Sequence, residues 1–337
     1  MTDEIYKEEV FKRNYNKLFK KNFVLKPCLC GSKENKLLFE FDRYNLLTSV
    51  VLCLKCGLVY ANKILSLEKL VEFYSSDSYR FFYNVINKKK IDLDKDDFID
   101  DQVFDQITSQ KISSIIENKY KSRSDEVILE FGSGYAQISR SIKRKGKLVC
   151  IDYSEKAITY LKKKDIEAYK GGIDILAKLN YQYDLIILSH VVEHFYDLKN
   201  ELNQILKYLK KNGIVYIEVP NLDSKYNLDQ IQNAHNYYFT KNTLLHYASL
   251  LNLKAEYVNE NVSDIHLGVI FSRERNKPFT YNRKDEIKKI ISFHKNLLSL
   301  GNFIKKNRSQ ISEKIKNLLG ISITIGIRKF IAKLRTW

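Results

Sequence analysis

The stretch VILEFGSGYAQISR, residues 127–140, decides the fold of this chain. It opens with apolar residues typical of a buried strand, bends at Gly132 and Gly134, and continues into a helical pattern. The chain holds only 12 glycines among its 337 residues, so two glycines this close indicate a tight turn against which a ligand can lie. The segment therefore predicts a strand, a ligand-binding turn and a helix, in that order.

Further apolar runs follow, separated by amphipathic stretches of about 10 to 15 residues. They read KLVCID, YDLIILS and GIVYIEV. This alternation predicts a parallel sheet covered by helices. Two later runs, at 253–260 and 266–274, are divided by a short polar loop and predict a closing antiparallel hairpin. The expected fold class is a doubly wound α/β domain.

Pattern and composition divide the chain into five expected parts. These are an N-terminal helix (1–22), a cysteine-bearing strand module (23–64), a helical connector (65–125), the α/β domain (126–275) and a basic helical tail (276–337). The connector is assigned as helical because its apolar residues recur at helical spacing.

The composition is that of a folded protein, with 44% hydrophobic and 29% charged residues. Its longest uncharged apolar stretches, such as 185–189 and 321–327, fall far short of the roughly 20 residues that a membrane-spanning helix needs. The first residues, MTDEIYKEEVFKR, contain no apolar segment typical of an export signal. We therefore expect a cytoplasmic protein.

Positive charge is concentrated at the C-terminal end. Residues 275–337 hold 16 Lys and Arg against three acids, which accounts for +13 of the formal net charge of +17. The segment IGIRKFIAKLRTW at 325–337 puts its apolar residues on one helical face and its bases largely elsewhere, a pattern typical of a helix at a membrane surface. Packing on the body or on a second subunit accounts for the pattern equally well. Peripheral contact with the inner face of the membrane is one prediction for this tail.

Four segments resemble the motifs of class I S-adenosylmethionine (SAM)-dependent methyltransferases. They are VILEFGSGYAQISR at 127–140, KLVCIDYS at 147–154, YDLIILSHVVEHFYD at 183–197 and LKKNGIVYIEVPN at 209–221, the last resembling a helix end, a turn and the fifth strand. The first departs from the family pattern by Glu130 for the commoner Asp and Ala136 for a third glycine. A G-x-G-x-x-G dinucleotide fingerprint fits less well. The resemblance implies a Rossmann-like methyltransferase sheet.

The resemblance also implies SAM as the cofactor. The residues that it assigns to cofactor binding are Glu130, Gly132, Gly134, Asp152, Asp174 and Ser189. Glu130 would orient the methionine amino group, and Asp152 would accept hydrogen bonds from both ribose hydroxyls. Asp174 would contact the adenine, and Ser189 would face the reactive end of the cofactor.

The remaining motif is made of cysteines. Cys28 and Cys30 form C-x-C-G, Cys53 and Cys56 form C-x-x-C-G, and the residues between the pairs read as strands. Four thiolates in a cytosolic chain favour a metal over disulfides, so we expect a zinc ribbon. A closed four-sulfur site would leave the ion structural rather than catalytic. Unpaired structural thiols are the alternative.

Methyl transfer is an in-line displacement that needs positioned reactants and, for many acceptors, a base. His235, in the segment HNYYFT, is the first candidate for this base because relatives line the acceptor pocket with a similar segment. The other catalytic candidates are His190, Glu193 and His194, in the loop after the fourth strand. Ala234 stands where sugar C-methyltransferases of this family carry Glu, and both O- and C-methylation remain open.

A cysteine module followed by a methyltransferase domain resembles the sugar methyltransferases of surface-polysaccharide and deoxysugar pathways. The expected acceptor is therefore a nucleotide sugar or a glycan precursor. One alternative is an RNA methyltransferase that uses the zinc module and the basic tail. It is less favoured, because SHVV at 189–192 replaces the N/D/S-P-P-Y segment of base amino-group methyltransferases. A second alternative is an inactive scaffold docked on a membrane through the tail, against which the intact cofactor motifs argue.

Overall fold

The computed structural model describes residues 3–70, 103–119, 125–142, 146–224, 231–259, 265–274 and 277–306. They form two compact units. The smaller unit takes described residues from 3–70, 231–235 and 282–306, and the larger takes them from 103–224 and 236–281. The predicted amphipathic segment at 325–337 lies outside the described residues. Among the helices described, none is long and apolar enough to cross a membrane.

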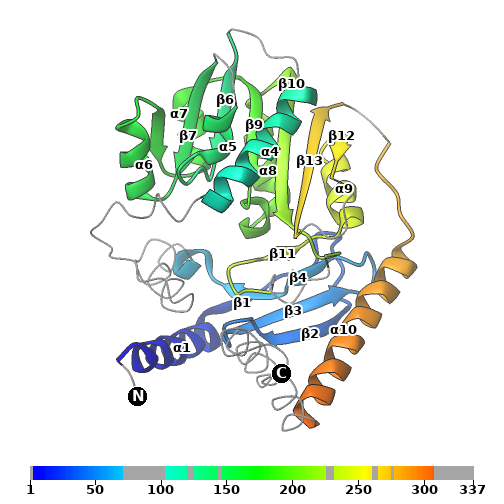
Figure 1. Ribbon diagram of the computed structural model, residues 1–337. Coiled ribbons are helices and arrows are strands. Elements are labelled where there is room, and N and C mark those ends of the chain that lie inside the picture. Colours follow the sequence, from blue (N-terminus) through cyan, green and yellow to red (C-terminus); the bar gives the residue numbers. More distant parts are fainter. Residues whose placement is uncertain are drawn as a thin grey trace, which may run out of the picture. The chain divides into compact units, whose positions relative to one another are not determined.

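The larger unit is built on one seven-stranded sheet (Figure 1). Its strands are β6 (Val127–Phe131), β7 (Lys147–Asp152), β8 (Glu167–Lys170), β9 (Tyr183–Ser189), β10 (Leu209–Pro220), β12 (Leu253–Val258) and β13 (His266–Arg273). Their order is β12-β13-β10-β9-β6-β7-β8, and the last five in that order run parallel. Strand β13 is antiparallel to both β10 and β12, which confirms the predicted closing hairpin. The α/β fold class is thereby confirmed.

Helices connect these strands. They are α4 (Val103–Lys119), α5 (Gln137–Ser141), α6 (Glu155–Lys162), α7 (Ile173–Leu179), α8 (Leu198–Leu206) and α9 (Lys241–Ser249), with a 3-10 turn η2 (Val192–His194) and a short strand β11 (Tyr237–Tyr238). Several begin at a capping side chain: Ser154 accepts from the Ala157 amide, and Asp197 accepts from the Asn200 amide. The Ser154 cap places the first turn of α6 directly after β7, and the Asp197 cap starts α8 after the 3-10 turn.

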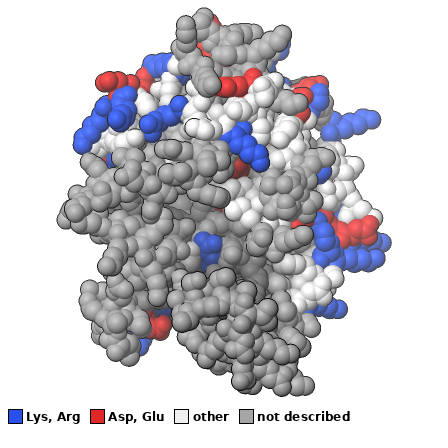
Figure 2. All heavy atoms as spheres, in the orientation of Figure 1, with Lys and Arg blue, Asp and Glu red and all other residues white. Residues whose placement is uncertain are grey.

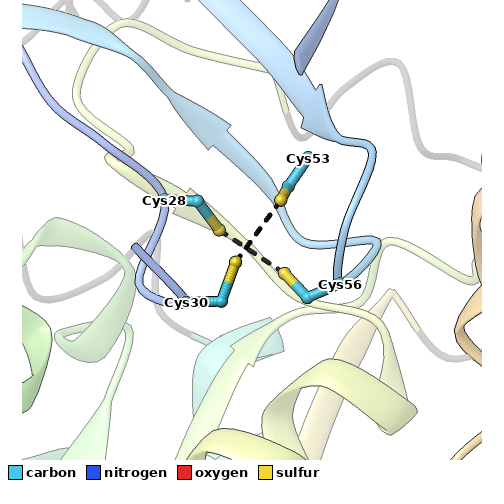
Figure 3. Close-up of side chains that lie close together, drawn as sticks. All are labelled: Cys28, Cys30, Cys53 and Cys56. Atoms are coloured by element: carbon cyan, nitrogen blue, oxygen red, sulfur yellow. Dashed lines mark hydrogen bonds between the residues drawn. The ribbon is translucent and has the colours of Figure 1, made fainter. Parts of the chain in front are cut away.

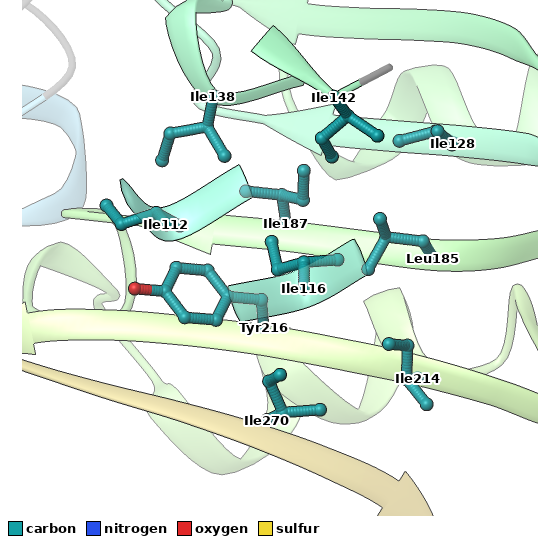
Figure 4. Packing of buried hydrophobic residues seen from close by; sticks show 10 residues of the cluster. All are labelled: Ile112, Ile116, Ile128, Ile138, Ile142, Leu185, Ile187, Ile214, Tyr216 and Ile270. Atoms are coloured by element: carbon teal, nitrogen blue, oxygen red, sulfur yellow. The ribbon is translucent and has the colours of Figure 1, made fainter. Parts of the chain in front are cut away.

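The core of the larger unit lies on both faces of the sheet. On one face α4 and α5 pack isoleucines against β6, β9 and β10 (Figure 4). The members of this cluster are Ile112, Ile116, Ile128, Ile138, Ile142, Leu185, Ile187, Ile214, Tyr216 and Ile270. The alternate strand positions, among them Leu129, Ile186 and Val215, are fully buried as well. Burial on both faces explains why these strands are continuous apolar runs.

Strand β10 differs from the expected pattern. Residues 209–213, LKKNG, were expected to end a helix and form a turn, but they are part of the strand. The register against β9 shifts between Leu209 and Ile214, so the polar residues occupy an irregular part of the ladder. There Lys210 donates to Asp184 at 2.7 Å. This contact gives a polar residue a partner at the edge of the core.

The smaller unit combines strands with two long helices. Its elements are α1 (Asp3–Asn22), β1 (Phe23–Leu25), β2 (Asn35–Phe41), β3 (Leu47–Cys53), β4 (Val59–Ala61), β5 (Lys63–Leu65) and α10 (Arg283–Lys306). Strands β2, β3 and β4 pair antiparallel, as do β1 and β5. His294 of α10 bonds through Nε2 to the Leu38 carbonyl at 2.8 Å, and its ring meets Phe39 edge-on. The basic region after 276 thus contributes a helix to this unit.

Candidate active site

The glycine turn after β6 has the geometry that only glycine adopts without strain. Gly132 has φ +68°, and a Cβ placed on it would overlap the side chain of Val191. Gly134 has φ +49°, and a Cβ placed there would meet no atom within 4 Å. Packing therefore requires the first glycine, whereas the second borders open space. A ligand can approach the backbone at Gly134.

Asp152, at the end of β7, faces this turn. Its Oδ2 accepts the amide of Gly134 at 2.8 Å, and its Oδ1 accepts the amide of Ser154 at 2.7 Å. The side chain is half-buried. Each carboxylate oxygen has two lone pairs, so both oxygens keep capacity to accept from a vicinal diol. The structure thus brings together Gly134 and Asp152, which the sequence assigned to one ligand.

Glu130 lies inside the domain. Its side chain is 4% exposed, and its Oε2 accepts from the amide of Ser139 at 3.0 Å and from the Ser139 hydroxyl. Burial raises the pKa of Glu130 to about 7, although the bonds from Ser139 act in the opposite direction. The carboxyl group anchors the start of α5. Its predicted contact with a methionine amino group stays a prediction.

The residues at the end of β8 lie close to Tyr153. A Cβ on Gly172 would overlap the Tyr153 hydroxyl, so the two residues are in direct contact. Asp174 accepts from the Gly172 amide at 3.3 Å and pairs with Lys178 at 3.3 Å. Tyr153 is 68% exposed, and the sequence analysis did not single it out. The available signal was an aromatic residue directly after the acid that ends a strand.

The loop after β9 holds several of the predicted catalytic residues. Ser189 donates to Oε1 of Glu218 at 3.0 Å, so its hydroxyl is used to hold a second side chain. His190 has φ +55°, and its Nδ1 lies 3.2 Å from Oε1 of the fully buried Glu193. Nε2 of His194 lies 4.0 Å from the same oxygen. His190 and His194 thus both lie beside the buried carboxylate of Glu193.

Two further residues belong to this group and were missed by the sequence analysis. Glu218, on β10, is 5% exposed and accepts from the Tyr216 hydroxyl at 2.7 Å. His266, at the start of β13, places its ring 4.4 Å from that of His190. Both lie in apolar strand patterns far along the chain from the loop. Only the sheet order brings them to the end of β9.

Asn236 fixes the shape of the same loop. Its side-chain amide donates to the carbonyls of His194 at 2.9 Å and Phe195 at 3.1 Å. Its backbone amide donates to the Glu193 carbonyl at 2.8 Å. The loop that carries the catalytic candidates is therefore held in one conformation.

His235, the first candidate for the base, belongs to the smaller unit. Its side chain is 3% exposed, and its ring contacts the side-chain amide of Gln232. Asp42 orders the same stretch by accepting the Asn233 amide at 2.9 Å. The part assigned to His235 in proton transfer stays a prediction.

The four motif cysteines converge in the smaller unit (Figure 3). The sulfurs of Cys28 and Cys56 are 3.4 Å apart, those of Cys30 and Cys53 are 3.6 Å apart, and all four lie within 4.8 Å of one another. A disulfide would need about 2.05 Å, whereas a tetrahedral zinc ion with Zn–S bonds of about 2.3 Å places its sulfurs roughly 3.8 Å apart. The arrangement fits a metal better than a disulfide.

Tight turns aim these thiols inward. Gly31 and Gly57 have φ +79° and +80°, and their amides donate to the carbonyls of Cys28 and Cys53. Hydrogen bonds to Cys53 and Cys56, together with burial, raise the pKa of the Cys28 thiol. A bound cation would favour the thiolate form instead, because four thiolate charges this close together need a cation among them.

Comparison with known proteins finds a family model that matches part of the larger unit. The family model described as "Methyltransferase domain" matches residues 104–259. This segment is therefore similar to that family over a little less than half of the chain. No curated protein matches the chain. The match covers the glycine turn, Asp152, the loop of His190 and Glu218, whereas His266 and the four motif cysteines lie outside it.

Solved structures similar to the chain include enzymes from bacteria and archaea. A SAM-dependent methyltransferase from Archaeoglobus fulgidus is 19% identical over 52% of this chain and 99% of its own, with a TM-score of 0.43. The 1,6-didemethyltoxoflavin-N1-methyltransferase of Burkholderia thailandensis is 12% identical over 65% of this chain and 96% of its own, with a TM-score of 0.45.

Proposed function

We propose that the chain is a SAM-dependent methyltransferase. The observation that carries this proposal is the pairing of the Gly134 amide with Asp152 beside open space, at the carboxyl ends of β6 and β7. Ligands of doubly wound sheets bind at such strand ends. Asp152 would accept the ribose hydroxyls, and Tyr153 and Asp174 would contact the adenine. The methionine end would then point toward Ser189 and His190.

Bound SAM supplies an electrophilic methyl group on a sulfonium ion. The residues of this chain would position the acceptor for transfer and would take up the acceptor proton at a base. We assign that base to His235, with His190 and His194 as the other candidates. Glu193, fully buried and 3.2 Å from Nδ1 of His190, would hold the ring orientation and stabilise a protonated imidazole.

The acceptor that we propose is a sugar, as a nucleotide sugar or a glycan precursor. The support is the order of the two parts along the chain, a cysteine module before a methyltransferase domain, which resembles sugar methyltransferases. Position 234 is Ala and carries no carboxylate, so we propose O-methylation on an equal footing with C-methylation. A carboxylate would have been expected to assist removal of a proton from carbon.

For the cysteine cluster we propose structural zinc. The donor set is four sulfurs at separations close to those of a tetrahedral site. Cys28, Cys30, Cys53 and Cys56 would hold the ion and link the two turns of the module. With four protein ligands no position would remain for an acceptor, so the ion would stabilise the fold.

RNA is the second candidate acceptor, favoured by the charge of +13 over residues 275–337. Most of that segment lies outside the described residues. On the face drawn in Figure 2, the Lys and Arg side chains of the described residues lie among Asp and Glu side chains. Interspersed charges favour a small acceptor over a polyanion.

Calorimetric titration with S-adenosylhomocysteine tests the cofactor site. The wild-type chain should bind, and Asp152→Asn should bind at least about 10-fold more weakly, because it loses a charged acceptor. Glu256→Gln, an exposed carboxylate change on β12, is the matched control and should bind normally. A wild-type chain without affinity would refute the proposed function.

Mass spectrometry identifies the acceptor. Incubation with SAM should add one methyl group to a nucleotide sugar, and the same incubation should leave RNA unchanged. His235→Ala should lower kcat while the affinity for S-adenosylhomocysteine stays the same. Methylated RNA in place of methylated sugar would favour the second candidate.

A further inference from the structure

Two histidines and a glutamate meet where three strands of the larger unit end. His190 follows β9, Glu218 lies on β10 beside Ser189, and His266 opens β13. Each offers a ligand atom, and these atoms lie within 4.8 Å of one another. Nε2 of His190 is 3.6 Å from Oε1 of Glu218. Tetrahedral ligands at about 2.0 to 2.2 Å from a metal lie roughly 3.4 Å apart, close to this separation.

The carboxylate of this group is held in place from two sides. Oε1 of Glu218 accepts from Ser189 at 3.0 Å, and Oε2 accepts from Tyr216 at 2.7 Å. These two hydroxyl donors fix the orientation of the carboxylate, as the hydrogen-bond partners of metal-ligating carboxylates do. With 5% of Glu218 exposed, its charge is largely removed from water. A buried anion of this kind requires a cation close by.

His190 is oriented as metal-binding histidines are. Its Nδ1 lies 3.2 Å from Oε1 of Glu193, and its Nε2 is directed at Glu218. A carboxylate on one ring nitrogen fixes the tautomer that presents the other nitrogen to a metal. His190 also takes the left-handed backbone conformation, φ +55°, which is uncommon for a residue with a side chain. The loop thus holds this ring in a specified position.

Two buried carboxylates beside His190 also make the site suitable for a cation. Glu193 is fully buried and Glu218 nearly so, and both face the same imidazole. A divalent ion bound to His190 and Glu218 would place positive charge near both carboxylates. His190 remains 38% exposed and His266 is half-buried, so an ion can enter from solvent.

We propose that His190, Glu218 and His266 bind a divalent transition-metal ion. Two imidazole nitrogens and one carboxylate oxygen favour ions such as Zn²⁺, Co²⁺ or Fe²⁺ over Mg²⁺ and Ca²⁺, which prefer oxygen ligands. Three protein ligands leave positions open for water or a hydroxyl oxygen. The site is separate from the cysteine cluster and uses none of its residues.

The test uses the full chain with its cysteine cluster already loaded with zinc, and Co²⁺ as the probe. Calorimetric titration should show one further ion bound per chain, and the absorption spectrum should lack a thiolate-to-cobalt charge-transfer band. His266→Ala and Glu218→Gln should each weaken this binding at least about 10-fold, and Glu193→Gln should weaken it by a similar factor through the orientation of His190. Glu256→Gln, on the same sheet, should leave it unchanged.

Two results would overturn the proposal. One is the absence of saturable Co²⁺ binding to the zinc-loaded wild-type chain, and the other is binding that His266→Ala leaves intact. Circular dichroism and thermal unfolding verify that each variant is folded. Since Glu218→Gln removes a buried carboxylate and can perturb folding, the half-buried His266→Ala variant decides the outcome.

Discussion

At the scale of single residues, the two glycines of the turn have different tasks. Gly132→Ala should place a methyl group against Val191 and strain a positive φ, at a cost of about 2–4 kcal/mol in the free energy of unfolding. Gly134→Ala meets no neighbouring atom, so its cost should be limited to roughly 1–2 kcal/mol of backbone strain. It should nevertheless weaken S-adenosylhomocysteine binding at least about 10-fold. Denaturant unfolding measures the stability of both variants, and calorimetry measures their affinity for S-adenosylhomocysteine. Equal losses of stability in the two variants would contradict the prediction.

Glu130 makes stability depend on pH. Burial raises its pKa in the folded chain from 4.5 to about 7, so between these values the unfolded chain loses a proton that the folded chain retains. The contribution of Glu130 to stability therefore falls as the pH rises through this window and is constant below and above it. Glu130→Gln should gain stability relative to wild type between pH 4.5 and 7, by up to about 3 kcal/mol. Urea unfolding of the wild type and the variant at the two ends of this pH window measures the gain. A stability difference that does not change with pH would contradict the prediction.

Site residues could be predicted from the sequence where a functional residue lies at the end of a predicted strand. Gly134 and Asp152 could be paired because Asp152 ends one strand of a parallel sheet and Gly134 lies in the turn after another. Glu218 and His266 could not be placed, because each lies in a strand pattern that gives no sign of its neighbours. Their association depends on the order of β9, β10 and β13, which the chain sequence does not state directly.

At the scale of elements, α4 is held to the sheet by its isoleucines. Ile116 is fully buried in the cluster with Ile187 and Leu185, so Ile116→Ala should lower the free energy of unfolding by about 2–5 kcal/mol. Ser114→Ala, two residues away on the exposed side of α4, is the control and should change it by less than about 0.5 kcal/mol. Denaturant titration followed by circular dichroism compares the two, and a small effect of Ile116→Ala would mean that α4 does not pack as described.

Helices and strands could be predicted from the sequence where burial produces a recognisable pattern of apolar residues. The runs that form β6, β7 and β9 are apolar because both faces are covered, and the sequence identified them. Residues 209–213 were assigned to a helix end and a turn, since polar residues and Gly213 resemble a connection. The register shift in β10 accommodates them inside a strand, and sequence patterns rarely reveal such shifts.

At the scale of the whole molecule, the smaller unit joins residues from distant parts of the chain. His294 of α10 bonds to Leu38 across a sequence separation of 256 residues. The sequence predicted a cysteine module and a basic helical tail but did not place them in one unit. Helical periodicity marks an apolar face and leaves its partner unspecified. The three-dimensional contact supplies that partner.

Removal of zinc should unfold the smaller unit and leave the larger unit folded. If the four thiolates hold a structural ion, chelation should abolish the thermal transition of the smaller unit, because metal binding there contributes directly to folding. The larger unit holds the proposed cofactor residues, so S-adenosylhomocysteine should still raise its transition temperature. Cys30→Ser should reproduce the effect of the chelator and lose one bound zinc per chain, whereas Cys150→Ala, in the core of the larger unit, should keep the zinc. Differential scanning calorimetry with metal analysis measures both, and an unchanged transition after complete zinc removal would refute a structural role.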